Sequence, residues 1–205
     1  MNTKNFVLDT VPNVFRTTRI DSFFYQKIIG MCNISLKIAS FNDIDITVLV
    51  NMINAVYRNA EDEIWQKEHL RISAERLTEI TEKQELLIAL IGNEIAGCIH
   101  LEPVNDLLYK FKMLAANPKY KGIGVGSKLV KFAEETALKN GANTMQLELL
   151  VPTNFVHPDK VFLHNWYSKI GYIKQSVHSV DYCHDGISQF LKTPCNAIVY
   201  QKPLI

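Results

Sequence analysis

Three glycines at alternate positions, Gly122, Gly124 and Gly126, separate a predicted strand from a predicted helix. Glycines at a helix start remove side chains from around N–H groups that have no intrahelical partner, and the helix dipole adds partial positive charge there. Such a turn can hold phosphate oxygens. Four lysines lie close to it in the sequence, namely Lys119, Lys121, Lys128 and Lys131. Glycine before a helix can also serve only close packing, so the turn alone leaves both interpretations open.

The spacing of these glycines argues against the two common nucleotide-binding loops. A P-loop has the pattern GxxxxGK followed by Ser or Thr, whereas the segment Gly126-Ser127-Lys128 has these residues in another order. A Rossmann fold has GxGxxG after its first strand and an acidic residue about 20 positions later. Here the spacing is GxGxG, and it follows several predicted strands. Both nucleotide folds are therefore disfavoured.

The periodicity of apolar residues predicts strands and helices in alternation around the turn. The first helix is expected to be capped by Asn42 or Asp43, the second begins at Ser73, and Gly92-Asn93 forms a tight hairpin turn. The predicted strands are 33–40, 86–91, 94–103, 107–116, 144–151 and 196–204, and the predicted helices include 46–57, 124–140 and 159–170. No repeat or linker interrupts this order. The fold class is therefore α/β (α+β) in one domain.

Composition narrows the class of protein further. The 22 Lys and Arg residues nearly balance the 21 Asp and Glu residues, which argues against nucleic-acid binding through a general basic surface. No apolar run is long enough to cross a membrane. The four cysteines are widely spaced and the first residues lack the apolar core of a secretory signal. We expect a cytoplasmic protein with an N-terminal extension at residues 1–32 and one domain at 33–205.

Two segments resemble motifs of one enzyme family. The run Lys121-Gly122-Ile123-Gly124-Val125-Gly126 resembles the pyrophosphate loop of the GCN5-related N-acetyltransferases (GNAT), in which Gln or Arg stands at the position of Lys121. Residues 162–172, FLHNWYSKIGY, resemble the family's LYEKLGF segment, whose tyrosine lies beside the thioester sulfur. Tyr167 occupies that place, and the family's upstream Asn is replaced by Lys160. From Asn33 to Pro203 the predicted order of strands and helices is similar to that of the GNAT family.

The resemblance implies a GNAT-like single domain whose central mixed, mostly antiparallel sheet is splayed at the cofactor site and flanked by helices. It implies an acyltransferase with acetyl-CoA as cosubstrate, and Tyr167 as the acid that protonates the leaving thiolate. The pantetheine arm would pair with the strand edge before the loop, and the pyrophosphate would bind the loop amides. The cofactor-binding residues implied in this way are Leu114, Ala115, Ala116, Lys121, Gly122, Ile123, Gly124, Val125, Gly126 and Ser127.

The general base is less defined by the sequence. His100 and Glu102 share one face of a predicted strand because strand side chains alternate, and histidine has a suitable pKa for removing a proton from an amine. A single strand histidine is more often structural, and Glu148 on a later strand is a competing carboxylate. The resemblance implies that the segment between the first two helices borders the acceptor cleft, so acceptor selectivity is expected there. The substrate residues predicted are Glu63, Trp65, Glu68, Arg71 and Glu148.

Three functions compete at this point. The first is an N-acetyltransferase acting on the primary amine of a small molecule by direct attack. The second is a non-catalytic acyl-CoA-binding sensor or interaction module, and the third is a protein or peptide N-acetyltransferase, which needs an open acceptor groove. The histidines and cysteines of the last third fit no zinc spacing, so no metal is expected. The expected partner is a small-molecule amine, with no nucleic acid or membrane, and a homodimer is left open.

Overall fold

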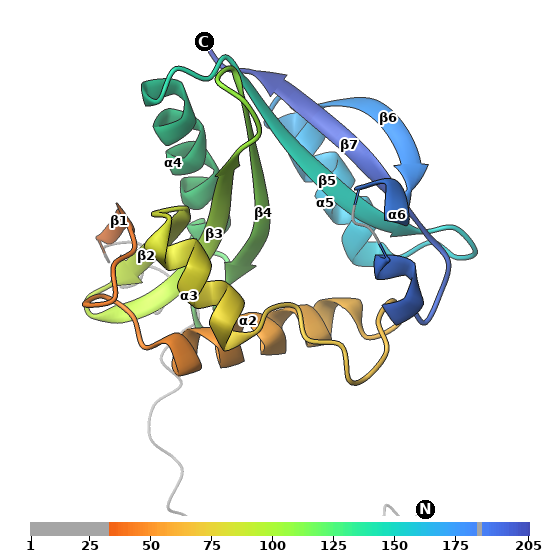
Figure 1. Ribbon diagram of the computed structural model, residues 1–205, viewed down its shortest axis with the longest axis horizontal. Coiled ribbons are helices and arrows are strands. Elements are labelled where there is room, and N and C mark those ends of the chain that lie inside the picture. The colour runs from red at the N-terminus through yellow and green to blue at the C-terminus, as the bar shows by residue number, and fades with distance from the viewer. Residues whose placement is uncertain (1–32, 184–185) are drawn as a thin grey trace, which may run out of the picture. The chain divides into compact units, whose positions relative to one another are not determined.

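The computed structural model describes residues 33–183 and 186–205, and the expected extension at 1–32 lies outside them (Figure 1). The described part contains one seven-stranded sheet with the order β1-β2-β3-β4-β5-β7-β6. The strands are β1 (Ile34–Ile38), β2 (Leu86–Ile91), β3 (Glu94–Pro103), β4 (Leu108–Ala116), β5 (Thr144–Pro152), β6 (Ile173–Ser179) and β7 (Cys195–Pro203). The helices are α2 (Ile46–Glu61), α3 (Ala74–Glu82), α4 (Val125–Lys139), α5 (Pro158–Lys169) and α6 (Val180–Cys183), with short 3-10 turns η1 (Pro118–Tyr120) and η2 (Ile187–Phe190).

The sheet is antiparallel at every pairing except that of β4 with β5, which is parallel. These two strands pair at only three positions, where residues 108–110 face residues 144–146. Beyond these positions the strands diverge, and Figure 1 shows the V-shaped opening between them. The mixed, mostly antiparallel and splayed sheet predicted from the resemblance is confirmed.

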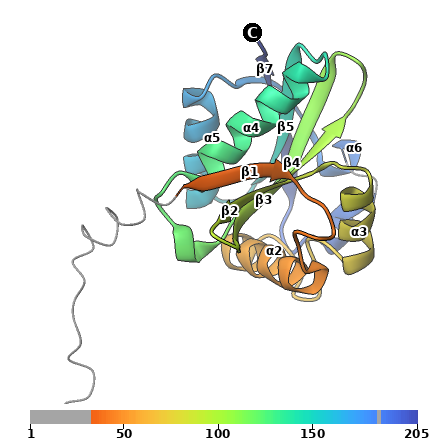
Figure 2. The same cartoon turned by 90° about the vertical axis from the view of Figure 1, so that its left-hand side faces the viewer.

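Two apolar clusters cover the two faces of the sheet. One cluster packs α4 and part of α5 against alternate residues of the central strands, including Leu87 and Ile99. The other packs α2 and α3 against the opposite face, including Leu86 and Ile88. Figure 2 shows α4 and α5 on one side of the sheet and α2 and α3 on the other. The continuous apolar run of β2 is explained by burial on both faces.

The hairpin, the loop and the helix after it lie where the sequence predicts them, and Ser73 caps α3 by accepting a hydrogen bond from the Arg76 N–H at 3.2 Å. The expected cap of α2 was wrong. Asp45 fills that position and accepts from the Val48 N–H at 3.0 Å. Asp43 instead holds the end of β1, because its carboxylate pairs with Lys37 at 2.6 Å.

Candidate active site

The glycine turn leads into helix α4, whose first residues have no capping side chain. Gly122 and Gly124 have φ values of 86° and 84°, a left-handed conformation that glycine adopts without strain. Gly124 occupies the N-cap position of α4 and forms no side-chain cap hydrogen bond. Within the described residues, no backbone N–H from Gly122 to Ser127 donates to another backbone carbonyl. These amides are therefore available to a ligand at the positive end of the helix dipole.

The lysines around the turn do not act as one group. Lys119 is held by Glu94, which also accepts a hydrogen bond from the Tyr120 hydroxyl at 2.6 Å. Lys131 forms an exposed pair with Glu135 on α4. Lys121 and Lys128 pair with no acidic residue in the described part of the chain. The sequence-predicted cation cluster therefore reduces to these two lysines.

A β-bulge shapes the edge of β4 that runs into this turn. The pairing register shifts between Cys98 and His100 of β3, and Met113 has a φ of 56°, which is rare for a non-glycine residue. The bulge reverses which face each following side chain meets. Leu114 contacts the α4 side of the sheet, whereas Met113 belongs to the cluster under α2. Strained backbone of this kind is concentrated at functional sites.

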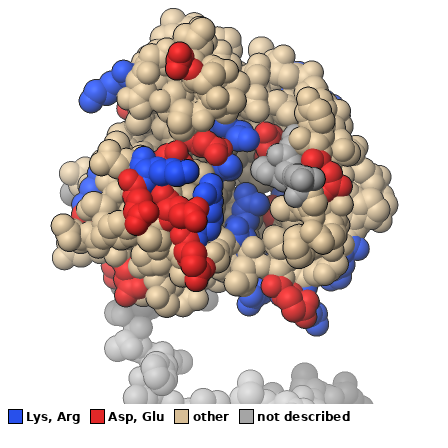
Figure 3. Space-filling model, viewed as in Figure 1, with Lys and Arg blue, Asp and Glu red and all other residues tan. Residues whose placement is uncertain are grey.

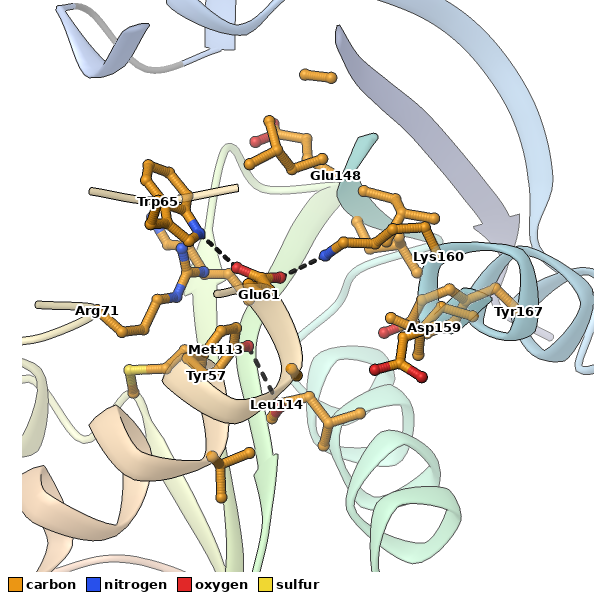
Figure 4. A pocket seen from close by; sticks show the side chains of 18 of the residues that line it. Tyr57, Glu61, Trp65, Arg71, Met113, Leu114, Glu148, Asp159, Lys160 and Tyr167 are labelled. Atoms are coloured by element: carbon orange, nitrogen blue, oxygen red, sulfur yellow. Dashed lines mark hydrogen bonds and ion pairs between the residues drawn. The ribbon is translucent and has the colours of Figure 1, made fainter. Parts of the chain in front are cut away.

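The opening between β4 and β5 holds a cavity of about 330 Å³ (Figure 4). Its wall includes Leu114 from the free edge of β4, Leu147 and Leu149 from β5, and side chains from α2 and α5. Six charged residues line it, namely Glu61, Arg71, Lys112, Glu148, Asp159 and Lys160. Figure 3 shows basic side chains in a hollow at the centre of this face, with acidic ones beside them. The cavity is thus lined by charges of both signs.

Tyr167 lies on α5 at the wall of this cavity and is only 6% exposed. Its ring packs against Phe111, Trp166 and Tyr172. Burial raises the pKa of Tyr167 well above its ordinary value, with a smaller contribution from Tyr57. The phenol is therefore protonated at neutral pH.

Tyr57 reaches the same cavity from α2 and donates a hydrogen bond of 3.2 Å to the carbonyl oxygen of Leu114. Burial raises its pKa to about 12. The Arg71 guanidinium lies 4.6 Å from the centre of the Tyr57 ring. These contacts tie α2 and the segment after it to the divergent part of β4.

A buried ion pair crosses the opening of the sheet. The Lys160 ammonium on α5 contacts the Glu61 carboxylate at the end of α2, and their side chains are 4% and 10% exposed. Trp65 donates its indole N–H to the second oxygen of Glu61 at 2.5 Å. Burial raises the pKa of Glu61, but the charges of Lys160 and Arg71 and these hydrogen bonds outweigh it and hold the pKa below its ordinary value. Glu61 is therefore ionised at neutral pH.

The segment between α2 and α3 is bonded to the segment between β6 and β7 above the cavity. Trp65 forms an isolated antiparallel bridge with Leu191, and the Gln66 N–H donates to the Phe190 carbonyl at 3.0 Å. The Lys192 N–H donates to the Ile64 carbonyl at 2.8 Å. We call residues 61–71 and 187–192 the roof of the cavity, because their mutual hydrogen bonds link the two halves of the sheet.

The structure separates the predicted bases. His100 is 2% exposed, lies outside the cavity wall, and shares a hydrogen bond of 2.9 Å with Glu85. Burial lowers the pKa of His100, and its hydrogen bond to the Glu85 carboxylate opposes this effect only in part. Glu102 also lies outside the wall and pairs at 2.6 Å with Lys112, which lines the cavity. Neither predicted base therefore lines the cavity directly.

The predicted substrate residues also divide into two groups. Trp65, Arg71 and Glu148 line the cavity, and Glu148 pairs with Lys110 at 3.3 Å. Glu63 and Glu68 are exposed and are not part of its wall.

Five polar or charged residues of the cavity wall are not among the predicted site residues, namely Tyr57, Glu61, Lys112, Asp159 and Lys160. Helical spacing gives a usable signal for two of them, because Tyr57 and Glu61 follow the buried Ile53 at intervals of four on one face of α2. The acidic run from Glu61 to Glu63 conceals this, since only Glu61 is buried. Asp159 carries no such signal.

The described residues contain neither a helix that could span a membrane nor a cluster of metal-binding side chains. None of their helices is long and apolar enough to cross a membrane. No group of three or more His, Cys, Asp or Glu side chains among them could hold a metal ion.

The comparisons with known proteins agree with this geometry. The model of the acetyltransferase (GNAT) family matches residues 50–172. Because the match covers more than half of the chain, the protein belongs to the GNAT family, and its enzyme class is that of an N-acetyltransferase. A search of curated proteins found no match.

Solved structures share the fold at low sequence identity. The PaiA N-acetyltransferase from Thermoplasma acidophilum in complex with coenzyme A has a TM-score of 0.63 and 16% identity, covering 83% of this chain and 99% of that one. A GNAT acetyltransferase from Elizabethkingia anophelis with acetyl-CoA bound has a TM-score of 0.58 and 17% identity, covering 84% and 99%. The ribosomal-protein-S18-alanine N-acetyltransferase from Escherichia coli has a TM-score of 0.56 and 13% identity, covering 84% and 94%. At such identities the likeness describes the fold alone.

Proposed function

We propose that the protein transfers an acetyl group from acetyl-CoA to the primary amine of a small molecule. The observation that carries this proposal is the roof over the cavity. An extended peptide needs an open groove, whereas here two segments meet beside the cavity at the bridge between Leu191 and Trp65, which lines the wall. A volume of about 330 Å³ also lies at the lower end of the range for small-molecule sites.

The chain's own groups fit acetyl-CoA. The amides from Gly122 to Ser127 and the ammonium groups of Lys121 and Lys128 suit a pyrophosphate. The backbone of β4 from Leu114 to Ala116 has no β5 partner, so it suits an extended pantetheine arm. This arrangement would direct the thioester toward Tyr167, which lines the same cavity.

In the reaction the amine nitrogen forms a bond to the thioester carbon, and the carbon–sulfur bond breaks with its electron pair on the sulfur. The nitrogen loses its second proton to solvent as the amide forms, and the departing thiolate of CoA takes up a proton from solvent. Negative charge develops on the carbonyl oxygen, and a backbone N–H beside the bulge at Met113 would stabilise it. Tyr167 would hydrogen-bond the departing sulfur. Because its pKa is raised above about 10 and that of a thiol is about 8.5, proton transfer to the thiolate is unfavourable. We therefore assign Tyr167 the role of a hydrogen-bond donor that remains protonated.

The attacking amine must first lose a proton, because a free alkylamine with a pKa of about 10.4 is mostly charged at neutral pH. Glu148 is the proposed base, since its carboxylate lines the cavity from β5. Glu102 remains as a positioning group, because it holds Lys112 at the cavity wall. His100 is not assigned a role in the reaction, because it bonds to Glu85 away from the cavity.

Titration calorimetry with acetyl-CoA and CoA, followed by measurement of thiol release with a panel of small amines and peptides, tests the proposal. We expect binding of both and turnover with small amines. Absence of binding would overturn the family-based cofactor assignment. Binding without any turnover would favour the sensor function, and turnover of peptides alone would favour the protein acetyltransferase.

Two variants on the same helix localise the pyrophosphate site. Lys128→Gln, in the first turn of α4, should weaken CoA binding several-fold. Lys139→Gln at the last turn is the matched control and should leave binding unchanged.

We also infer a cytoplasmic location from the widely spaced cysteines, of which Cys98 and Cys195 are free and buried.

A further inference from the structure

The cavity wall carries equal numbers of basic and acidic side chains, but not every one of them forms an ion pair. Three basic and three acidic side chains line it, namely Arg71, Lys112, Lys160, Glu61, Glu148 and Asp159. Lys160 is neutralised by Glu61, Lys112 by Glu102, and Glu148 contacts Lys110. Arg71 is the basic group of this wall that has no ion pair within the described part of the chain.

The surroundings of Arg71 hold its guanidinium in place without neutralising it. The guanidinium lies over the ring of Tyr57 at 4.6 Å, and a cation on an aromatic face keeps its charge. The charge of Arg71 interacts with that of Glu61, whose two oxygens already contact Lys160 and Trp65. The group formed by Arg71, Lys160 and Glu61 therefore has one excess positive charge.

We propose that Arg71 binds a carboxylate of the acceptor, so that the acceptor is a small amine that carries a carboxylate, as an amino acid does. This inference rests on the proposed acetyl transfer to a small amine. The planar guanidinium offers parallel N–H donors that match a carboxylate in a bidentate arrangement. One excess positive charge suits a monoanion, whereas a phosphate monoester carries a charge of about −1.5 to −2.

The position of Arg71 agrees with this role. Figure 4 shows Arg71 on one side of the cavity and Tyr167 on the other, with Glu61 and Lys160 between them. An acceptor bound through its carboxylate at Arg71 would extend its amine toward Leu114 and Tyr167, where the thioester is proposed to lie. A zwitterion also matches the zero sum of the six charges on the wall.

The test compares matched acceptors in the thiol-release assay with saturating acetyl-CoA. Each free amino acid is paired with its amide and its decarboxylated amine, and O-phosphoethanolamine serves as the phosphate-bearing amine. Three variants are compared with the wild type. Arg71→Gln removes the charge, and Arg71→Lys keeps the charge without the bidentate geometry. Arg76→Gln removes an exposed arginine on α3 that pairs with Glu79, and serves as the matched control.

We expect kcat/KM for the best free amino acid to exceed that of its amide and amine by at least about tenfold, the effect of a charged hydrogen bond. Arg71→Gln should abolish this ratio, Arg71→Lys should retain part of it, and Arg76→Gln should leave it intact. CoA binding should be unchanged in all three variants, which shows that each is folded.

Each other outcome has a definite meaning. Equal or faster turnover of the amides, amines or O-phosphoethanolamine would overturn the carboxylate assignment while leaving the proposed acetyl transfer intact. Persistence of the preference in Arg71→Gln would also overturn it. No turnover of any amine despite acetyl-CoA binding would instead refute the proposed function, and the inference with it.

Discussion

Removing either partner of the buried pair between Glu61 and Lys160 should destabilise the protein strongly, and the two removals should differ. Glu61→Met leaves the buried Lys160 ammonium without its partner and removes the carboxylate that also interacts with the charge of Arg71. Lys160→Met leaves the Glu61 carboxylate near Arg71 and still bonded to the Trp65 indole. The loss of Glu61 should therefore cost more than the loss of Lys160.

The magnitudes follow from burial. Both side chains are about nine-tenths or more buried, with exposures of 4% and 10%, so an unpaired charge there regains little hydration. Breaking such a pair costs about 3–5 kcal/mol, and replacing both partners by apolar residues is often close to neutral. We expect the upper end of this range for Glu61→Met and the lower end for Lys160→Met. The double variant should lose less than either, so the coupling free energy should exceed the larger single loss, about 5 kcal/mol.

Urea denaturation of the four proteins at neutral pH measures these free energies of unfolding. Lys131→Met, which removes an exposed pair on α4, is the control and should have little effect. Because the folded-state pKa of Glu61 is lowered, its stabilising contribution is present above the unfolded pKa of about 4.3 and is lost as the pH falls further. Additive effects of the two substitutions, or equal stability of Glu61→Met and wild type, would refute the reasoning.

Four further predictions follow from single positions. Tyr167→Phe should lower kcat at least about tenfold in the thiol-release assay, with CoA affinity in calorimetry unchanged. Gly124→Val should weaken CoA binding by more than about tenfold, because φ is 84° and the added side chain would occupy phosphate space. Gly97→Ala should lower the free energy of unfolding by about 1–3 kcal/mol in urea, since its Cβ would lie 2.7 Å from the Ala115 carbonyl oxygen. Between about pH 7.5 and 5.5 the wild type should lose more stability than His100→Gln, because the lowered folded-state pKa lets only the unfolded state take up a proton below about 6.5.

Each of these predictions has a contrary result. Unchanged kcat in Tyr167→Phe would contradict the proposed hydrogen bond from Tyr167 to the sulfur. Unchanged CoA affinity in Gly124→Val would contradict the assignment of the pyrophosphate to this turn. A stable Gly97→Ala would mean that β4 and α4 adjust at little cost. Identical pH dependence of His100→Gln and wild type would show that this imidazole does not resist protonation.

Much of the fold is encoded locally and could be predicted. Alternating apolar residues define β1, the turn at Gly92-Asn93 fixes the register of the hairpin, and the start of α4 follows from Gly124. The cap of α2 could not be assigned in this way, because three acceptors occur close together. Asp43 was already bound to Lys37, a contact that depends on β1 and not on the helix pattern.

The cavity wall could be predicted where motifs are contiguous in the sequence, and less well where it is assembled from distant segments. Tyr167 and Leu114, which the family motifs indicate, line the cavity, and the binding role of the loop glycines stays a prediction. The pairing of Glu61 with Lys160 joins positions 99 residues apart, and a run of three acidic residues normally indicates a solvated surface. Strand alternation alone predicted that His100 would face the cavity. Its hydrogen bond to Glu85 depends on the neighbouring strand β2, which the alternation pattern of β3 does not describe.

The three-residue pairing of β4 with β5 has a mechanical consequence. At one end these strands are joined by that short pairing, and at the other the Glu61–Lys160 pair and the roof connect the same two halves. The result is a frame connected at both ends. We therefore expect ligands to bind with little ordering of the protein, so that more of the contact free energy becomes affinity.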